Sequence, residues 1–328
     1  MGIEENLKIF DGLDTWSIVF QKIQNESDYE AAGFSFTAAR NPLNINLNRY
    51  TNVAPYDHSR ILLKDGETNY INASLVEGCC TLVTPTTLSS VPNNGVTKKD
   101  MSPDLAPPIE LNQYRRYILT QGPLENTACH FWQMVWEQNS FAIIMLTKVM
   151  EKGVMKCTQY WPNGKINDDK DSYFFEETGF KITLLHEDEE RFFTIRRFLL
   201  QYIPTGASRE VLHFQYTTWP DNGVPDSPAD FIHFLLAVRQ SGAFNQNVGP
   251  PIVHCSAGIG RSGTFCLVDS ALVEIEVKKN LNSINVNKLL IYMRKFRMGL
   301  IQTFDQLRFS YVTIIEGGRR ILQNNYLV

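Results

Sequence analysis

A cysteine and an arginine stand at the two ends of a short glycine-rich stretch, His254-Cys255-Ser256-Ala257-Gly258-Ile259-Gly260-Arg261-Ser262-Gly263-Thr264. The apolar run at 250–253 precedes the stretch and is typical of a buried strand, whereas the run at 264–269 has the spacing of a helix. The stretch is therefore expected to be a loop that joins the end of a strand to the start of a helix.

Such a loop is a predicted anion site, because a helix start carries unpaired backbone N–H groups and the positive end of the helix dipole. Gly258 and Gly260 allow the N–H groups of residues 256 to 261 to turn inward around one centre. Arg261 adds a planar fork that suits phosphate oxygens. Cys255 lies at the base of this loop, where its thiol is expected to ionise easily. The pattern predicts phosphoryl transfer to the cysteine.

Two other interpretations of the loop are weaker. A lone cysteine after an apolar run is usually a small buried hydrophobic residue, but the glycines, the arginine at the sixth position and the hydroxyl of Ser262 favour a nucleophile. A Walker loop is excluded because no G-K-[ST] is present.

The composition limits the class of protein. The 328 residues are 43% hydrophobic, enough for a sizeable core, and the net charge of −4 gives no nucleic-acid footprint. The six cysteines are scattered, so neither a metal site nor a disulfide framework is expected, and a reducing, intracellular compartment is favoured. No apolar run reaches transmembrane length, and the first residues lack a secretory or myristoylation signal. We expect no cofactor, no metal, no nucleic-acid partner and no membrane span.

Hydrophobic periodicity predicts alternating helices and strands. The first forty residues repeat apolar side chains at helical spacing, as at Trp16, Val19, Phe20 and Ile23, and a loop is expected at 41–50. Strands are expected near 60–63, 70–73, 117–120 and 141–146, antiparallel strands across 173–218, and helices at 125–138, 228–239, 286–297 and 304–322. Ser227 and Pro228 are a predicted helix start.

Residues 79–113 differ from the rest of the chain. They are rich in Thr, Ser, Pro and Asn, and no aromatic residue occurs between Tyr70 and Tyr114. Since such a segment has little to bury, it is interpreted as a flexible insertion at a loop tip. With no internal repeat, residues 1–328 are expected to form a single α/β (α+β) domain, a twisted mixed β-sheet flanked by helices.

The loop resembles the signature H-C-S-x-G-x-G-R-[ST]-G of the protein-tyrosine phosphatases, and in particular the small intracellular non-receptor enzymes of the T-cell type. The resemblance implies the cysteine phosphatase fold. Further segments that resemble the family are Asn48-Arg49-Tyr50, Asn69 to Ser74, Thr120-Gln121-Gly122-Pro123, His130-Phe131-Trp132, Gln159 to Pro162, Trp219-Pro220-Asp221 and Met293 to Thr303.

The resemblance implies a role for each site residue. Cys255 attacks phosphorus, and Asp221 is the general acid for the leaving tyrosine oxygen. Ser262 donates a hydrogen bond to the sulfur or caps the helix. Catalytic positions also include Arg261, Gln302 and Gln306, the two glutamines placing the water of the second step. His254 supports ionisation of the cysteine, and Glu151 either pairs with Arg261 or is an exposed turn carboxylate. The implied substrate-binding residues are Tyr50, Asn52, Ser256, Ala257, Gly258, Ile259, Gly260, Arg261, Asp221 and Gln302.

Three positions depart from the subgroup. Asn222 follows the general acid where an aromatic residue is often found, and Asn52 stands where the subgroup has a carboxylate that holds the peptide backbone. Gln24 replaces an arginine beside Arg294, so a second phosphotyrosine pocket is not expected. None of the three belongs to the catalytic set.

The resemblance implies an enzyme that hydrolyses phosphotyrosine in proteins, in signal transduction, with receptor or cytoplasmic tyrosine kinases and their substrates as partners. It implies a cytoplasmic location, or a membrane-associated or nuclear one where a C-terminal tail directs it. Three alternatives are weaker. A phosphotyrosine-binding pseudophosphatase would be damaged at Cys255, Arg261 or Asp221, and all three residues are intact. A dual-specificity phosphatase would be smaller and would lack the Tyr50 loop, and a scaffold role of residues 79–113 is compatible with catalysis.

Overall fold

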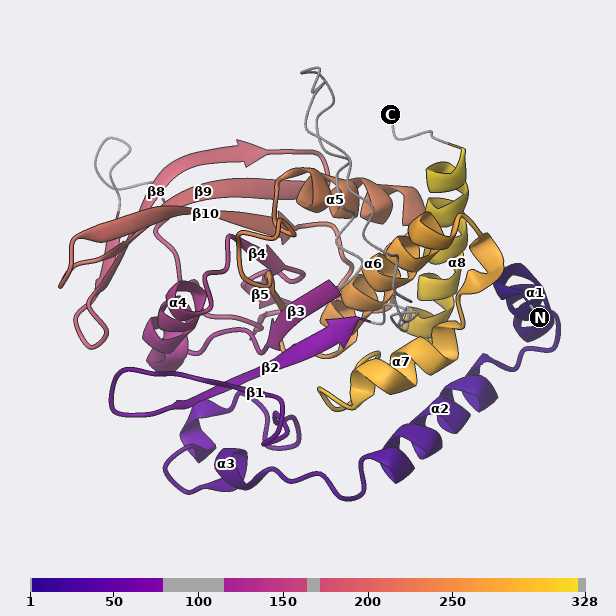
Figure 1. The fold of residues 1–328 in the computed structure, drawn as a ribbon, viewed down its shortest axis with the longest axis horizontal. Helices are drawn as coiled ribbons and strands as arrows, with labels where there is room; N and C mark the ends of the chain where they lie inside the picture. The colour runs from indigo at the N-terminus through magenta and orange to yellow at the C-terminus, as the bar shows by residue number, and fades with distance from the viewer. Residues whose placement is uncertain (1, 79–114, 164–171, 324–328) are drawn as a thin grey trace, which may run out of the picture.

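The computed structural model describes residues 2–78, 115–163 and 172–323 (Figure 1). The predicted insertion at 79–113 lies outside these residues. The strands on either side of it pair directly, since Gly78 of β2 (Tyr70–Gly78) is the antiparallel partner of Arg115 of β3 (Arg115–Thr120).

One large mixed sheet runs through the described part of the molecule, in the order β1-β2-β3-β11-β4-β10-β9-β8-β7. Its four central strands, β3, β11, β4 and β10, are parallel to one another, and the outer pairs are antiparallel. The remaining strands are β1 (Arg60–Leu62), β4 (Ala142–Met145), β7 (Ser172–Phe175), β8 (Phe180–Glu189), β9 (Phe193–Tyr202), β10 (Ala207–Tyr216) and β11 (Ile252–His254), with a separate hairpin of β5 (Met150–Glu151) and β6 (Val154–Met155).

Side chains alternate between the two faces of the sheet, and each face has its own apolar core. Ile144 and Val253 pack in the same core as α6 side chains such as Phe265, whereas the adjacent Ile143 and Ile252 pack in the core that contains α4. The helices are α1 (Ile3–Gly12), α2 (Trp16–Glu30), α3 (Thr37–Arg40), α4 (Ala128–Glu137), α5 (Pro228–Gln240), α6 (Gly260–Lys278), α7 (Val286–Arg294) and α8 (Phe304–Leu322). Short 3-10 turns form at Ile45–Leu47, Glu125–Thr127 and Leu281–Ser283.

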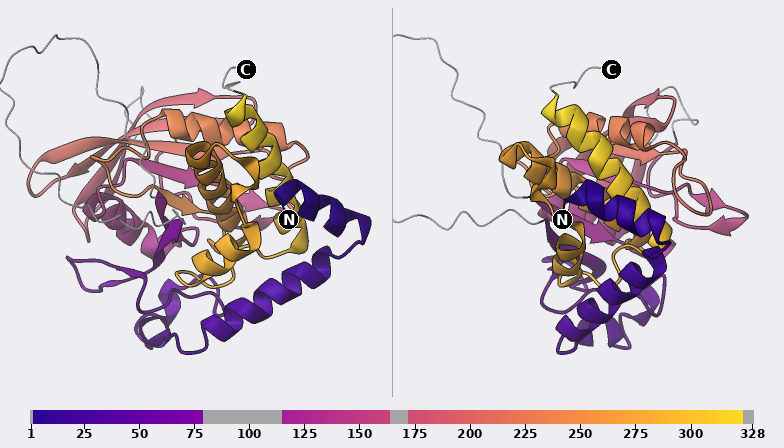
Figure 2. Two further views of the ribbon diagram at one scale, coloured as in Figure 1. Left: turned by 45° about the vertical axis from the view of Figure 1, so that its right-hand side comes forward. Right: turned by 90° about the vertical axis from the view of Figure 1, so that its right-hand side faces the viewer.

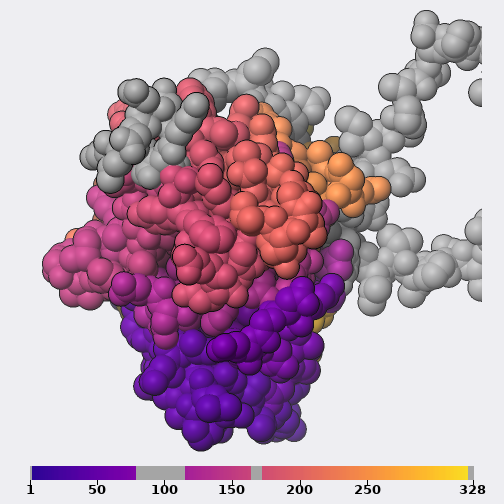
Figure 3. All heavy atoms as spheres, turned by 90° about the vertical axis from the view of Figure 1, so that its left-hand side faces the viewer, coloured from indigo at the N-terminus to yellow at the C-terminus, as the bar shows by residue number. Residues whose placement is uncertain are grey.

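The layers bring the first and last helices together. Helix α1 lies against α8 in all three ribbon views, and Trp16 of α2 makes an edge-to-face contact with Tyr311 of α8 at 5.2 Å (Figures 1 and 2). At the opposite end of the molecule, the early segment that includes α3, in violet, and the outer strands, in pink, share one surface (Figures 1 and 3).

Most predicted elements form, with several differences in extent and one in pairing. The strand expected at 70–73 runs to Gly78, and α6 begins at Gly260, inside the stretch expected to be a loop. The expected helix at 125–138 begins with a 3-10 turn, and the helix expected to reach residue 297 ends at Arg294. The expected antiparallel run at 173–218 is confirmed for β7–β10, but β10 also pairs in parallel with β4, which places it inside the sheet. Alternation along one strand carries no information about the direction of its neighbour. The predicted cap of α5 is confirmed, because the Asp230 N–H donates to the Ser227 hydroxyl.

Candidate active site

The parallel strands bring their carboxyl ends to one edge of the sheet. His254, the last residue of β11, lies in register with Thr120 of β3 and with Met145 of β4. The segment after β10 leads to Trp219-Pro220-Asp221 at the same edge. Because parallel strands end together, four chain segments that are distant in sequence meet around Cys255.

The cysteine loop is a tight turn between β11 and α6. Gly258 has a positive φ of 70°, and a Cβ atom there would lie 2.0 Å from the carbonyl oxygen of Thr120. A Cβ atom at Gly260 would lie 2.4 Å from Gln302 Oε1. Gly258 therefore requires glycine, both for its backbone conformation and for the close approach of the Thr120 carbonyl, whereas the short contact at Gly260 is with the end of the Gln302 side chain.

The loop surrounds a pocket of about 470 Å³. Cys255 is only 4% exposed, and it lines this pocket together with Asp221. The expected residues that line it are Tyr50, Asn52, Glu151, Asp221, Cys255, Ser256, Ala257, Arg261, Gln302 and Gln306. Ser262 and His254 are fully buried beside the loop, and Gly258, Ile259 and Gly260 form its backbone rather than the wall of the pocket.

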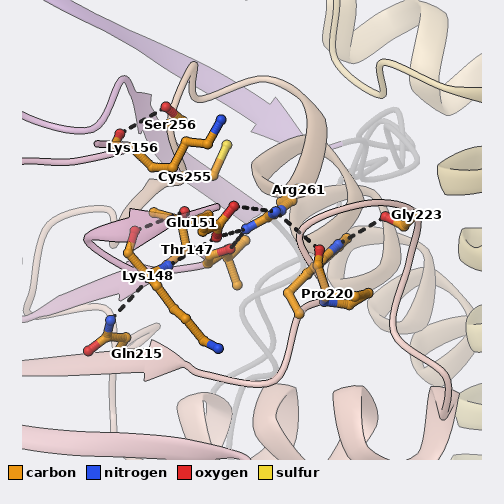
Figure 4. Close-up of polar contacts among 12 residues, drawn as sticks. Thr147, Lys148, Glu151, Lys156, Gln215, Pro220, Gly223, Cys255, Ser256 and Arg261 are labelled. Atoms are coloured by element: carbon orange, nitrogen blue, oxygen red, sulfur yellow. Dashed lines mark hydrogen bonds and ion pairs between the residues drawn. The ribbon is translucent and has the colours of Figure 1, made fainter. Parts of the chain in front are cut away.

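Arg261 is fixed by a carboxylate and two carbonyl groups. Its Nη1 and Nη2 donate to the two oxygens of Glu151 at 2.6 and 2.9 Å, and Figure 4 shows this paired arrangement beside Cys255. Nη1 also donates to the carbonyl of Leu146, and Nη2 donates to that of Pro220 at 3.3 Å. The arginine thus connects the cysteine loop to the segment of Asp221.

Glu151 is a buried carboxylate and not the exposed turn residue of the alternative interpretation. Burial by itself would raise the pKa of its carboxyl group, but the hydrogen bonds and charge of Arg261, helped by Thr147 and the Lys148 N–H, lower the pKa below its usual value. Glu151 therefore stays ionised and holds the guanidinium in a fixed plane.

Tyr50 forms one wall of the pocket and is connected to the cysteine loop. Ser256 Oγ donates to the carbonyl of Lys156 at 2.8 Å, which uses its only proton, so the Tyr50 hydroxyl donates to Ser256 Oγ at 2.8 Å. Arg49 anchors the same segment by donating to the carbonyls of Gly122 and Pro123.

The two glutamines lie at the entrance of the loop. Gln306 Oε1 accepts the N–H of Gln302 at 2.8 Å, and the N–H of Ile301 donates to the carbonyl of Ile259 at 3.1 Å. The segment 301–306 is thereby held against the cysteine loop.

Ser262 does not take either role expected of it in this structure. Its hydroxyl is buried without a hydrogen-bond partner among the described residues, and no side chain caps the start of α6. A buried, unpaired hydroxyl next to an anion site is available to a group that arrives there.

Sequence reasoning missed Arg297, which lies behind the cysteine loop. It is fully buried, and it donates to the carbonyl groups of Gly258 and Ala257 and to side-chain oxygens of Ser74 and Asn72. Burial lowers its pKa to about 10. The signal was an arginine inside the family-like run 293–303, to which no role was assigned.

His254, Tyr160 and His213 form a second buried group beneath the loop. Tyr160 Oη lies 2.7 Å from His254 Nε2 and 2.9 Å from His213 Nε2. Neither Tyr160 nor His213 was singled out from sequence. Across residues 2–78, 115–163 and 172–323, no group of three or more metal-ligating side chains is found, and no helix there is long and apolar enough to cross a membrane.

Comparison with known proteins agrees with this geometry. The family model for protein-tyrosine phosphatase matches residues 44–316. The chain is 47% identical over 315 residues to human tyrosine-protein phosphatase non-receptor type 2, covering 95% of this chain and 65% of the human protein. It is 46% identical to the mouse protein of the same name, covering 97% and 67% of the two chains, and 44% identical to Drosophila melanogaster tyrosine-protein phosphatase non-receptor type 61F, covering 95% and 50%. The chain thus spans one half to two thirds of the length of these relatives.

Proposed function

The chain belongs to the protein-tyrosine phosphatase family, and we propose that it hydrolyses phosphotyrosine in proteins through a cysteinyl-phosphate on Cys255. The observation that carries the proposal is that Cys255, Arg261 and Asp221 line one pocket. Two hydrogen bonds to Glu151 hold the guanidinium of Arg261 in a fixed plane.

In the first step the sulfur of Cys255 attacks phosphorus, an S–P bond forms and the bond from phosphorus to the tyrosine oxygen breaks. Asp221 in its acid form gives its proton to that oxygen as it leaves. The backbone N–H groups of residues 256 to 261 and the guanidinium of Arg261 stabilise the equatorial phosphate oxygens, since phosphoryl transfer depends mainly on positioning and charge.

In the second step water attacks phosphorus, and the S–P bond breaks. Gln302 and Gln306 orient the water, and the carboxylate of Asp221 accepts its proton. We propose that the hydroxyl of Ser262, which has no partner among the described residues, turns toward the sulfur as the S–P bond breaks. The pair of steps returns Cys255 to its starting state and releases inorganic phosphate.

The pocket selects phosphotyrosine by depth. Tyr50 forms a wall on which an aromatic ring stacks, and Asn52 lies at the rim to hold the backbone of the peptide. A phosphoserine side chain is too short to bring its phosphate to the buried sulfur of Cys255 from the same rim. We propose that the substrates are phosphotyrosine proteins of signalling, including receptor or cytoplasmic tyrosine kinases and their targets, and that the enzyme acts in the cytoplasm.

The test is hydrolysis of an aryl phosphate and of a phosphotyrosine peptide by the purified chain, with Cys255→Ser as the control. We expect turnover that orthovanadate inhibits, and a variant that still binds the phosphopeptide but releases no phosphate. Wild-type binding without turnover would make the chain a phosphotyrosine-binding module.

A further inference from the structure

Four side chains form a continuous hydrogen-bonded chain that ends at the backbone of the nucleophile. Arg196 Nη1 lies 3.4 Å from His213 Nδ1, and His213 Nε2 lies 2.9 Å from Tyr160 Oη. Tyr160 Oη lies 2.7 Å from His254 Nε2, and His254 Nδ1 lies 3.1 Å from the carbonyl oxygen of Cys255. Strands β9, β10 and β11 and the segment after β6 each supply one of these side chains.

Both imidazole rings carry a single proton. Burial lowers the pKa of His254 to about 4, a shift that its contact with the Cys255 backbone only partly opposes. Burial, together with Arg196 and His254, lowers the pKa of His213 well below its usual value. At neutral pH each ring is therefore neutral, with one nitrogen that donates and one that accepts.

The two ends of the chain determine where these protons lie. Arg196 can only donate, so His213 Nδ1 accepts and the proton of His213 is on Nε2. His213 then donates to Tyr160 Oη, whose own proton is free to go to His254 Nε2. The proton of His254 is consequently on Nδ1, where it meets the carbonyl oxygen of Cys255, a group that can only accept. The reversed order would place two N–H groups against each other at Arg196 and two lone pairs against each other at the Cys255 carbonyl.

We propose that Arg196 is a positioning residue for the nucleophile, which acts through His213 and Tyr160 to keep the Nδ1–H of His254 bonded to the carbonyl group of Cys255. The reactive role of Cys255 rests on the proposed function, whereas the proton order rests on the hydrogen-bond geometry alone. The carbonyl group of Cys255 thereby keeps a hydrogen-bond donor, and the cysteine loop keeps a defined orientation.

Arg196 is itself held on several sides. Its Nε pairs with Glu187 of β8, and its Nη1 also donates to Gln215 Oε1 at 2.9 Å. Its guanidinium lies 5.1 Å from the centre of the Trp161 ring. Gln215 Nε2 in turn donates to the carbonyl of Thr147, whose hydroxyl bonds Glu151, as the left side of Figure 4 shows. Arg196 is therefore connected through His213 to the cysteine loop, and through Gln215 and Thr147 to Glu151, the partner of Arg261.

The other ionisable groups near these four side chains do not determine the direction of the hydrogen bonds between Arg196 and Cys255. Burial raises the pKa of Cys157 to about 12, so this thiol is neutral. The charge of Arg49 favours neutral His254, but its guanidinium donates to backbone carbonyls and not to either ring. Among the described residues, Arg196 is the donor that contacts His213 Nδ1.

The first test uses the intact protein. Nitrogen-15 NMR of histidine-labelled protein at pH 7 distinguishes the two neutral forms of each ring. We expect His254 protonated on Nδ1 and His213 protonated on Nε2. The opposite assignment at either ring would overturn the proposal, and no variant has to fold for this result.

The second test is the rate of alkylation of Cys255 by iodoacetamide between pH 5 and 7, followed by peptide mass spectrometry. Arg196→Met keeps the contact with Trp161 but removes the donors, and should lower the rate about 2- to 10-fold, the value of one hydrogen bond. Arg196→Lys should restore part of the loss. In a Tyr160→Phe background Arg196→Met should have no further effect, because the connection is already broken.

The matched control is Arg197→Met, the next residue of β9, whose partner Glu210 is exposed. We expect no change in its alkylation rate. An unchanged rate in Arg196→Met, or an equal loss in both backgrounds, would refute action through Tyr160. Neither test measures phosphate release, so failure of this inference and failure of the proposed function are distinguishable.

Discussion

Arg297 Nε donates to the carbonyl oxygen of Gly258 over 2.8 Å, which ties a fully buried arginine to the middle of the cysteine loop. A second bond from Nη2 reaches the carbonyl of Ala257 at 3.2 Å. No carboxylate pairs with Arg297 in the part of the chain that the structure describes. The guanidinium therefore bonds the backbone of the cysteine loop, and its positive charge lies next to that loop.

Arg297→Met is expected to reduce kcat by about 10²-fold, because misplacement of the loop by about 1 Å has that effect on positioned groups. The measurement is steady-state hydrolysis of an aryl phosphate. The control is Arg209→Met, which also removes two bonds to buried carbonyls, those of Ser140 and Val135, but far from the pocket. It should lower Tm and leave kcat near the wild-type value. Equal effects of the two substitutions on kcat would contradict the special role of Arg297.

Asp221→Ala is expected to lower kcat by about 10²–10⁴-fold, the usual contribution of general acid catalysis. The loss should shrink for aryl phosphates whose leaving groups need no proton. Asp305→Ala, which removes another carboxylate of the same pocket, is the control and should show no dependence on the leaving group. A loss that is constant across leaving groups would remove Asp221 from the acid role.

Tyr50→Ala is expected to lower kcat/KM for a phosphotyrosine peptide by about 2- to 10-fold, since stacked aromatic pairs contribute about 0.5–1.5 kcal/mol. Tyr50→Phe keeps the wall and removes only the bond to Ser256, so it should retain selectivity. The measurement compares matched phosphotyrosine and phosphoserine peptides. Comparable kcat/KM values for both peptides in the wild type would instead indicate a dual-specificity enzyme.

Folding stability should fall as the pH drops from about 6.5 to 4. The unfolded chain binds protons at both buried histidines in this range, whereas His254, with a pKa of about 4, and His213 stay neutral in the folded state. Each contributes a slope of about 1.4 kcal/mol per pH unit, so His254 alone accounts for about 3 kcal/mol.

Urea unfolding at several pH values measures this slope. His213→Gln should reduce the slope by the contribution of one proton, about 1.4 kcal/mol per pH unit, whatever the change in absolute stability. A slope equal to that of the unsubstituted protein would show that His213 is not held neutral in the fold.

Replacing residues 80–112 by a short turn should leave aryl phosphate hydrolysis nearly unchanged, because Gly78 and Arg115 already pair and loop length costs only about 0.6 kcal/mol per doubling. Thermal unfolding of the shortened and full chains is the measurement. A decrease in Tm of more than about 4 °C, which corresponds to more than 1 kcal/mol for a domain of this size, would show that the segment belongs to the folded core.

Local sequence was sufficient for the cysteine loop, the cap of α5 and most helices and strands. Those features depend on residues within one turn or one strand of each other: a cysteine and an arginine six positions apart with glycines between them, and a serine before a proline at a helix start. Resemblance to a family added Asp221, Glu151 and Tyr50, which lie at the pocket as expected.

Only the tertiary structure determined how distant segments meet. The parallel pairing of β10 with β4 brings the Asp221 segment to the cysteine, and no periodicity within 207–216 specifies that partner. The buried contacts of Arg297 and the chain from Arg196 to Cys255 likewise join side chains from separate strands and loops. These hydrogen bonds are strong because the groups are buried and each donor faces an acceptor. Both conditions arise only after the sheet has brought the groups together.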